Sequence, residues 1–495
     1  MTLVRLLDRA ALRYPDAPAV VDGACRLTYA QLASRAAALG RGLADTGVAK
    51  GDRVLIALKN RVEHVLVYWA LQGIGGVPTP VNFRLTPRDL RYVLEDCGAR
   101  VALFEPATAA AMLEAADGWP GRLVAVGDEA PAGTIPFADL VGSGAAPLYR
   151  DVSEHDLSLF LYTSGTTGRP KGVPRTHRNH HAGALAHVIQ CGYQWGERTL
   201  GVMPLYHTMG IHSLTSMAAV NGCFVCQADW SADAALSLIE AERVTALYLI
   251  PTLYHELVHS AGFSSEKAAS VTKLAYAGAP MLATLTEACV KAFRPKVFVN
   301  HYGSTEIYTF SVHRDQRAKP GCAGRPAANA RLRLDPPGEG EILCHMSSDE
   351  AFAGYWNRPD ADEKAIHDGW YSTGDVGRLD DDGDLWVVGR VDDMIISGGE
   401  NVHPVEVEDV LARAPGVNEV AVVGEPDDRW GQRVVAFVVT DEGVTAEQLD
   451  AHCLASETLA RFKRPREYRF VPELPKSASG KILRRLLRDQ AEERV

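Results

Sequence analysis

The sequence of 495 residues is short of positive charge, of paired cysteines and of long apolar runs. Its 51 lysine and arginine residues are outnumbered by 62 aspartate and glutamate residues, which gives a formal net charge of -11. Non-specific nucleic-acid binding depends on cationic neutralisation of phosphates, so this balance excludes broad nucleic-acid binding. An anionic ligand must therefore meet local basic groups.

The absence of long apolar runs and of a cysteine framework indicates in which cellular compartment the protein is expected. No apolar run is long enough to span a bilayer, and Arg5, Asp8 and Arg9 interrupt the apolar stretch that a signal peptide needs. The nine cysteines are scattered, and the close pair Cys223 and Cys226 lacks a second pair to complete a zinc site. We expect buried thiols in a cytoplasmic protein without a membrane partner.

Helix and strand signals alternate through the first part of the chain. Thr28 and Gln31 form a capping box before an Ala/Leu-rich helix that should stop at Gly47, and residues 52–58 follow as a buried strand. Thr86 and Pro87 then open another helix, before a strand from Arg100. This alternation predicts an α/β fold in which helices cover parallel sheets.

A charged, glycine-rich stretch at 389–401 divides the chain and has the composition of a hinge. It predicts a large, multi-lobed N-terminal domain over 1–390 and a small α+β C-terminal domain over 391–495. In the small domain, Pro404 should begin a helix and Thr445 should precede another. Strands are expected at 417–424, 433–439 and 467–471.

Residues 162–173, YTSGTTGRPKGV, carry the strongest chemical signal. The segment follows an apolar strand, and its backbone N–H groups, hydroxyls and one ammonium can surround a polyphosphate. It is not a Walker A loop, since only two residues separate Gly165 from Gly168, and taken alone it could be a surface turn. The candidate phosphate ligands are Thr163, Ser164, Gly165, Thr166, Thr167, Gly168 and Lys171.

This loop resembles the phosphate-binding motif of the adenylate-forming superfamily, which includes acyl-CoA synthetases, peptide adenylation domains and firefly luciferase. Further matches follow in the family's order at 204–210, 276–280, 301–306, 370–375, 389–408 and 475–485. The resemblance therefore spans nearly the whole chain. It implies an enzyme that uses ATP and Mg²⁺ to convert a carboxylic acid into an acyl-AMP.

The resemblance also implies roles for individual residues around the nucleotide. Glu306 would hold Mg²⁺ through its carboxylate, and Thr305 would bind the α-phosphate. Tyr302 would stack on adenine, while Asp375 and Arg390 would hold the ribose. Other nucleotide contacts implied by the motifs are Gly278, Ala279, Pro280, Gly303 and Ser304. Lys481, on the small domain, corresponds to the catalytic lysine that stabilises charge during attack on the α-phosphate.

The C-terminal half is most similar to the 4-chlorobenzoate and related aryl-CoA ligases, which pass the acyl group to coenzyme A. In that branch, the residue at the place of Asp392 is the hinge of a mobile C-terminal domain, and Gly398 and Gly399 line the pantetheine tunnel. The corresponding contacts to the CoA nucleotide would be Trp430, Phe462, Arg464 and Arg466. Aromatic rings stack on adenine, and guanidinium groups pair with phosphates.

The same resemblance places the acid pocket. Its lining would be Ala186, His207, Thr208, Met209, Tyr248, Ala277, His301, Gly303 and Tyr308. His207 would face the carboxylate. His301 and Tyr308 stand where the chlorobenzoate enzymes carry aliphatic side chains, so we expect a benzoate-type acid with a hydroxyl or similarly polar substituent.

Three alternatives to an aryl-CoA ligase stay open, and the oligomeric state is open as well. The acid could be a short or medium-chain alkanoate, or the enzyme could load a carrier protein. However, the aspartate that usually binds a substrate amine is absent near His207. A catalytically silent nucleotide-binding regulator is the third alternative, although Lys171, Glu306 and Lys481 are all present. The assembly is left open between monomer and homodimer.

Overall fold

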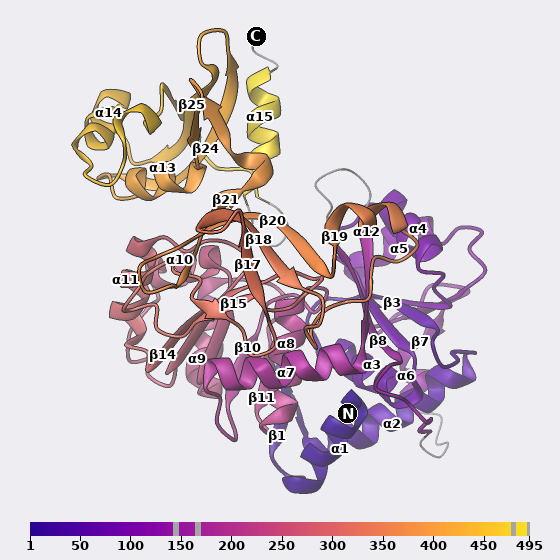
Figure 1. Ribbon diagram of the computed structural model, residues 1–495. Helices are drawn as coiled ribbons and strands as arrows, with labels where there is room; N and C mark the ends of the chain where they lie inside the picture. Colours follow the sequence, from indigo (N-terminus) through magenta and orange to yellow (C-terminus); the bar gives the residue numbers. More distant parts are fainter. Residues whose placement is uncertain (142–147, 164–169, 477–481, 493–495) are drawn as a thin grey trace.

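A computed structural model describes residues 1–141, 148–163, 170–476 and 482–492. Within them, the largest sheet has nine strands (Figure 1). In spatial order these are β16 (Arg325–Pro326), β15 (Ser311–His313), β14 (Val297–Tyr302), β13 (Lys273–Tyr276), β12 (Ala246–Leu249), β10 (Arg198–Gly201), β11 (Cys223–Cys226), β1 (Pro18–Asp22) and β2 (Cys25–Thr28). The strands from β14 to β1 are parallel, whereas β15, β16 and β2 are antiparallel to their neighbours.

Helices cover both faces of this nine-stranded sheet. Side chains alternate along a strand, so Phe298 and His301 of β14 point to opposite faces. Phe298 packs against Tyr254 of α10, and His301 packs against His187 of α7. One face therefore carries α7 (His177–Cys191) and α8 (Thr208–Ala219), and the other carries α9 (Ala232–Glu242), α10 (Pro251–His259) and α11 (Ala283–Phe293). Burial on both faces explains why β11 and β12 are apolar throughout.

A second parallel sheet is formed near the N-terminus by β4 (Val77–Pro80), β3 (Arg53–Ala57), β5 (Val101–Phe104), β6 (Arg122–Ala125) and β7 (Ile135–Pro136). The helices of this region are α1 (Leu3–Arg13), α2 (Tyr29–Asp45), α3 (Val62–Ile74), α4 (Pro87–Asp96), η1 (Pro106–Thr108), α5 (Ala109–Ala115) and α6 (Phe137–Val141). The capping box of Thr28 and Gln31 is confirmed, and Thr86 caps α4 as predicted. The helix predicted to stop at Gly47 ends at Asp45.

A hairpin lies between these two lobes, and an antiparallel sheet precedes the C-terminal part. The hairpin pairs β8 (Leu157–Thr163) with β9 (Lys171–Thr176), which places Thr163 opposite Lys171. The sheet contains β17 (Leu332–Asp335), β18 (Glu339–His345), β20 (Trp370–Leu379), β19 (Ile366–His367) and β21 (Leu385–Arg390), and α12 (Pro359–Ala365) precedes β19.

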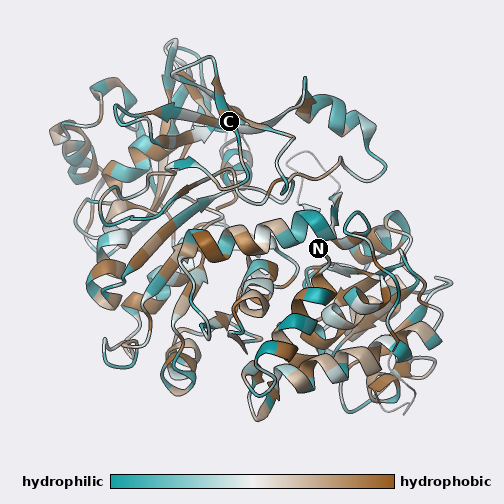
Figure 2. Cartoon of the chain, turned by 60° about the horizontal axis from the view of Figure 1, so that its bottom comes forward, coloured by the Kyte–Doolittle hydropathy of each residue, from teal (hydrophilic) through white to brown (hydrophobic). Residues whose placement is uncertain are grey.

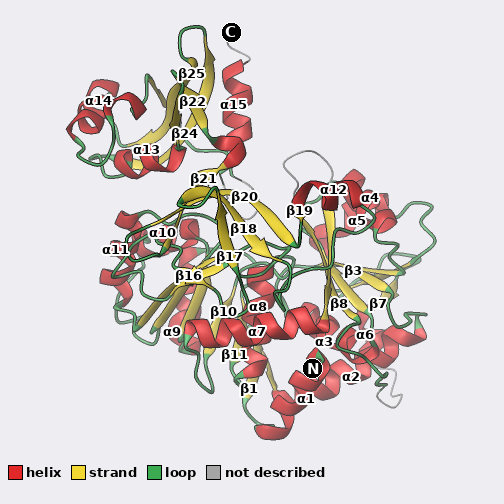
Figure 3. Ribbon diagram, in the orientation of Figure 1, coloured by secondary structure: helices red, strands yellow, loops and turns green. Residues whose placement is uncertain are grey.

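The C-terminal part has its own sheet and hydrophobic core (Figure 3). Its strands are β23 (Glu400–Val402), β22 (Ile395–Ser397), β25 (Gly431–Thr440), β24 (Val417–Asp427) and β26 (Glu467–Phe470). Its helices are η2 (Val391–Asp393), α13 (Pro404–Leu411), α14 (Ala446–Ala455), η3 (Arg461–Lys463) and α15 (Arg484–Glu492). Pro404 begins α13 and Thr445 caps α14, as the sequence predicted.

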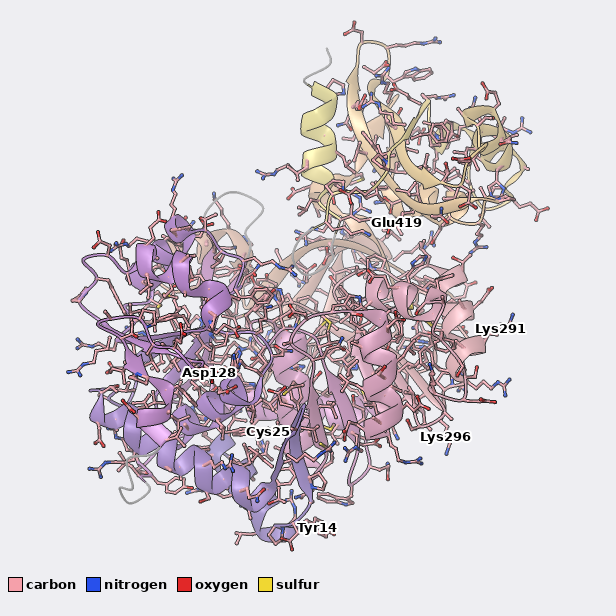
Figure 4. The ribbon with its side chains drawn as sticks, turned by 180° about the vertical axis from the view of Figure 1, so that it is seen from behind. Tyr14, Cys25, Asp128, Lys291, Lys296 and Glu419 are labelled. Atoms are coloured by element: carbon pink, nitrogen blue, oxygen red, sulfur yellow. The ribbon has the colours of Figure 1, made fainter. Side chains whose placement is uncertain are left out.

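The distribution of polar and apolar residues supports an ordinary globular interior. The strands inside the two large lobes are mainly hydrophobic in Figure 2, whereas many outer helix turns are hydrophilic. Figure 4 shows Tyr14 at the end of the molecule far from the C-terminal part, and Glu419 where that part faces the rest. Eight of the nine cysteines are buried and all are free, while Cys25 is partly exposed. No helix among the described residues is both long and apolar enough to cross a membrane.

Candidate active site

The predicted site residues gather where the parallel strands of the nine-stranded sheet end. Chain segments leave the carboxyl ends of β10, β13 and β14 at 202–207, 277–280 and 303–306. Carboxyl ends of parallel strands meet at one edge of a sheet, where ligands of open α/β folds usually bind. The sequence motifs 204–210, 276–280 and 301–306 therefore lie on one edge.

A connected set of polar side chains joins this edge to the antiparallel sheet of β17, β18, β19, β20 and β21. The hydroxyl of Tyr302 donates to Asp375 Oδ2 at 2.6 Å, and Arg390 Nη1 donates to Asp375 Oδ1 at 3.0 Å. Asp375 and Arg390 are direct partners in the pairing of β20 with β21. Burial, together with the nearby Asp375 charge, raises the pKa of Tyr302 well above its usual value. The three residues are held in place before any ligand binds.

A second polar group surrounds the carboxylate of Glu306. This residue is 6% exposed, and its Oε1 accepts a hydrogen bond from the hydroxyl of Tyr355 at 2.7 Å. The ammonium of Lys171 lies 3.8 Å from the centre of the Tyr355 ring. Burial lowers the pKa of Lys171, although the Glu306 charge opposes that shift. One anion and one cation thus meet beside the end of the predicted phosphate loop.

Part of the predicted loop and the predicted catalytic lysine lie outside the described residues. These are Ser164, Gly165, Thr166, Thr167, Gly168 and Lys481. Thr163 and Lys171, which flank the loop, are described. The hydroxyl oxygen of Thr163 is buried and has no hydrogen-bond partner within the part of the chain that the structure describes.

Sequence reasoning missed Arg175, which holds the backbone of the 303–306 segment. Arg175 is fully buried, and its Nη1 donates to the carbonyls of Thr305 at 3.0 Å and Glu306 at 2.5 Å. Its Nη2 donates to the carbonyl of Glu350. A buried guanidinium must be paired, and here backbone carbonyls supply the partners. The position of the Glu306 carboxylate therefore depends on a residue of β9.

Two glycines at this edge have structural reasons to be glycine. A Cβ atom on Gly303 would lie 2.0 Å from the carbonyl oxygen of Tyr308, so no side chain fits. Gly278 has φ +84°, a left-handed backbone conformation that residues with a Cβ rarely adopt. Next to Gly278, Ala279 and Pro280 complete the segment, and Ser304 Oγ accepts from the backbone N–H of Glu306 at 3.2 Å.

Several predicted acid-pocket residues belong to one buried group of rings. We call His187, His212, Tyr248, His301 and Tyr308 the histidine cluster. His187 lies 4.7 Å from Tyr248 and 4.9 Å from His301 between ring centres, and His212 lies 4.4 Å from Tyr308. Burial lowers the pKa of both His212 and His301 to about 3, so all these imidazoles stay neutral near pH 7.

Some polar atoms of the cluster have no partner. His301 Nδ1 and His212 Nε2 are buried without a hydrogen-bond partner among the described residues. A buried polar atom left unpaired costs about 1–3 kcal/mol, so it favours a ligand that can pair with it. The guanidinium of Arg175 lies 3.7 Å from the centre of the Tyr308 ring and connects the cluster to the 303–306 segment.

Helix α7 carries one predicted pocket residue and one that was not predicted. Ala186 is buried on α7, directly before His187, whose ring enters the cluster and which sequence reasoning missed. His212 was also missed. His187 follows His180 by seven residues and Cys191 follows His187 by four, and this helical spacing was the available signal.

The segment that begins α8 presents the other predicted pocket residues. His207 precedes α8, Thr208 begins it and Met209 is buried within it. The His207 ring lies 4.6 Å from that of Tyr206, and burial lowers its pKa to about 4. Ala277 is buried at the end of β13. His207 is therefore a neutral imidazole at the same sheet edge.

The predicted coenzyme A contacts assemble in part. Gly398 and Gly399, both with positive φ, turn between β22 and β23, and Gly398 N–H donates to the carbonyl of Trp430 at 2.7 Å. Arg466 lies 5.7 Å from the Trp430 ring centre. In contrast, Arg464 is paired with Asp450 at 2.8 Å, and Phe462 is 42% exposed.

The predicted hinge is held from within the C-terminal part. Asp392 lies in η2, and its carbonyl accepts from Arg488 Nη1 at 3.1 Å. Arg488 Nη2 also donates to Asp393 at 3.0 Å. Arg488 of α15 therefore hydrogen-bonds to η2, the segment that links the C-terminal part to the rest of the chain.

Comparison with known proteins agrees with this arrangement. Residues 7–356 match the AMP-binding enzyme family, and residues 406–481 match the AMP-binding enzyme C-terminal domain. A 4-chlorobenzoate–CoA ligase from Arthrobacter sp. is 34% identical over 505 residues, covering 99% of this chain and 95% of the relative. A long-chain-fatty-acid–CoA ligase from Mycobacterium tuberculosis is 34% identical, covering 94% of this chain and 93% of the relative.

A solved structure extends the similarity to three dimensions. The anthranilate CoA ligase in complex with anthranoyl-AMP superposes with a TM-score of 0.93 at 28% identity. The match covers all of this chain and 98% of that protein. Its large and small domains have counterparts in the arrangement described above.

Proposed function

This chain belongs to the family of AMP-binding enzymes, and we propose that it joins an aromatic carboxylic acid to coenzyme A in an ATP-dependent, AMP-forming reaction. The observation that carries the proposal is similarity along the whole chain to two ligases of aromatic acids, in sequence and in structure. The site geometry supports it, because the polar groups needed for a nucleotide and a ring-lined cluster meet at one sheet edge.

In the first half-reaction, a carboxylate oxygen of the acid attacks the α-phosphorus of ATP, and pyrophosphate leaves. The buried Glu306 carboxylate suits Mg²⁺, which would neutralise phosphate charge when bound. Lys171 supplies an ammonium beside it. The backbone of Thr305, fixed by Arg175, positions the hydroxyl assigned to the α-phosphate.

Nucleoside binding is assigned to the connected residues Tyr302, Asp375 and Arg390. The Asp375 carboxylate can accept hydrogen bonds from both ribose hydroxyls, because a carboxylate offers about four lone-pair positions and Tyr302 and Arg390 use only part of them. The Tyr302 ring offers a face for the adenine. Lys481 is assigned to the charge that develops on the two reacting oxygens.

In the second half-reaction, the CoA thiolate attacks the acyl carbon and AMP leaves. Trp430 and Arg466 offer an aromatic ring and a guanidinium for the CoA nucleotide, and Gly398 of the Gly398–Gly399 turn lies against the Trp430 ring. Arg464 would have to leave Asp450 to contact a phosphate. Both half-reactions need the same acyl carboxyl, so the C-terminal domain must move between them, with Asp392 as the hinge.

The hinge assignment has a direct test. Asp392→Pro restricts φ and should slow one half-reaction far more than the other. The two steps are separated by measuring pyrophosphate release without CoA, and thioester formation from supplied acyl-AMP. Equal slowing of the two steps, or no slowing, would contradict domain alternation about this residue.

The histidine cluster favours an aromatic acid with a polar substituent. Tyr248 and Tyr308 offer ring surfaces, and the unpaired His301 Nδ1 and His212 Nε2 offer partners for a hydroxyl or amino group. Discrimination of about tenfold or more against an unsubstituted or chlorinated ring follows from leaving such atoms unpaired. An alkanoate is the second candidate, because one relative is a long-chain-fatty-acid–CoA ligase.

The deciding experiment measures AMP release with CoA over a panel of acids. The panel contains benzoate, 4-hydroxybenzoate, 4-aminobenzoate, 4-chlorobenzoate, octanoate and several amino acids. We expect the highest kcat/KM with a hydroxy- or amino-substituted benzoate. A clear preference for octanoate would overturn the aromatic assignment. Acyl-AMP formation without any thioester product would instead indicate a carrier protein as acceptor.

A further inference from the structure

A buried thiol and two imidazoles meet at the inner end of the histidine cluster. Cys191 Sγ lies 3.7 Å from His187 Nε2 and 3.6 Å from His301 Nε2. One candidate ligand atom from each of the three residues can be chosen so that all lie within 4.8 Å of one another. Each residue is at most 3% exposed. His187 and Cys191 share one face of α7, and His301 comes from β14.

These separations match those between ligands of one tetrahedral metal ion. Zinc–sulfur and zinc–nitrogen bonds of about 2.3 and 2.0–2.1 Å place a sulfur and a nitrogen ligand about 3.6 Å apart. Ligands four residues apart on a helix, as His187 and Cys191 are, are a common arrangement in metal sites. Neutral imidazole nitrogens and a thiolate sulfur are the ligand atoms that zinc takes in proteins.

Two other groups of metal-ligating side chains in the described residues already have protein partners. Asp380, Asp382 and Asp384 surround the ammonium of Lys319 at 2.6–2.9 Å. In the group of His313, Cys322 and Asp384, the Cys322 thiol donates to a backbone carbonyl and Asp384 pairs with Lys319 and Arg325. The three-residue group at Cys191 differs, because the thiol lies within 3.7 Å of a ring nitrogen of each of the two histidines.

We propose that His187, Cys191 and His301 bind a divalent ion of the zinc class. Three protein ligands leave one tetrahedral position for water or a substrate atom, the arrangement of open zinc sites. On binding, the Cys191 thiol loses its proton to solvent and the sulfur–metal bond forms. A metal on His301 Nε2 fixes the ring proton on Nδ1, the atom without a partner, which makes Nδ1 a hydrogen-bond donor toward the acid.

Cobalt(II) provides the direct test, because a thiolate ligand gives it a charge-transfer absorption and tetrahedral geometry gives it intense visible bands. The full-length protein is stripped with a chelator, titrated with CoCl₂ and followed by absorption, and ZnCl₂ is then added. We expect one equivalent of cobalt to produce both features, and zinc to abolish them. The absence of a thiolate band at saturating cobalt would overturn the proposal.

Variants identify the ligands. Cys191→Ala should lose the charge-transfer band, and His187→Gln should weaken cobalt binding by at least about tenfold. Cys289→Ala is the matched control, since Cys289 is equally buried on α11, and it should keep the band and the affinity. A band that persists unchanged in Cys191→Ala would also overturn the proposal.

Folding is checked by the thermal midpoints of the metal-free proteins. If Cys191→Ala does not fold, Cys191→Ser replaces it, because serine keeps the volume and lacks the soft sulfur ligand. Zinc should raise the wild-type midpoint and leave that of the Cys191 variant unchanged. A zinc-induced rise of equal size in both proteins would place the ion elsewhere and count against this site.

Discussion

The nucleotide residues and the histidine cluster differ in whether their buried polar atoms have hydrogen-bond partners. The side chains of Tyr302, Asp375, Arg390 and Glu306 are already paired by short hydrogen bonds. In the histidine cluster, His301 Nδ1 and His212 Nε2 have no partner among the described residues. The paired side chains would bind ATP, which is the same whatever acid is used. The unpaired nitrogens of the cluster lower the free energy of binding only for an acid whose polar substituent can hydrogen-bond to them.

This contrast separates catalysis from specificity. Changes around the nucleotide should reduce the reaction with every acid by the same factor. Changes in the cluster should alter the ratio between acids and leave ATP affinity unchanged. The predictions below test that separation, beginning with the largest expected effect.

Replacing Lys481 with alanine should give the largest effect and confine it to one half-reaction. We expect pyrophosphate release to fall about 10²–10³-fold, because an ammonium aimed at the reacting oxygens is lost. Supplied acyl-AMP should still react with CoA at the wild-type rate. The two rates are measured separately by pyrophosphate and thioester assays. If both fell equally, Lys481 would not be the residue of adenylation.

Glu306→Gln should reduce adenylation of every acid by about a hundredfold, because a neutral amide stabilises a metal–phosphate complex poorly. The hydrogen bond from Tyr355 can persist, so folding should be retained. Rates for benzoate, 4-hydroxybenzoate and octanoate are compared across a magnesium titration. Glu266→Gln, on the surface, is the control and should match the wild type. A loss that differed among the acids would break the proposed separation.

His301→Ile should change the preference among acids and little else. We expect the ratio of kcat/KM for 4-hydroxybenzoate over 4-chlorobenzoate to fall about tenfold, since the polar partner is removed. The KM for ATP should not change. The exposed His259→Ala variant controls for loss of a histidine elsewhere. An unchanged ratio would remove His301 from the specificity assignment.

Local signals in the sequence predicted much of the fold. The capping box at Thr28, the cap at Thr86 and the proline at 404 act within one helical turn, so neighbouring residues determine them. The sequence also predicted helix-covered parallel sheets, and this arrangement explains why the motifs that follow β10, β13 and β14 lie on one sheet edge. Parallel strands bring their carboxyl ends together whatever lies between them.

Contacts between distant residues could not be predicted in the same way. Cys191 and His301 are separated by 110 positions, and their meeting depends on which face of α7 covers the sheet. Histidines lie on both the buried and the partly exposed faces of that helix, at His180 and His181, so polarity does not reveal the inner face. Arg175 was missed for a similar reason, because its partners are backbone carbonyls that leave no pattern in the sequence.

The smallest expected effect concerns acid sensitivity, and it tests the neutral state of the cluster. Burial lowers the pKa of His301 to about 3, against about 6.5 in the unfolded chain. Between these values the unfolded chain binds the extra proton, so the free energy of unfolding falls as pH falls below about 6.5. From pH 6.5 to 5, one such histidine accounts for about 2 kcal/mol of that loss.

The free energy of unfolding of His301→Gln should therefore fall by about 2 kcal/mol less than that of the wild type between pH 7.5 and 5, measured by urea unfolding in the presence of a chelator. His259→Gln, at an exposed position of α10, is the control for removal of a histidine outside the cluster. An equal loss in the His301 variant would mean that this ring takes up its proton as readily in the folded protein as in the unfolded chain, which would contradict the neutral state assigned to the cluster.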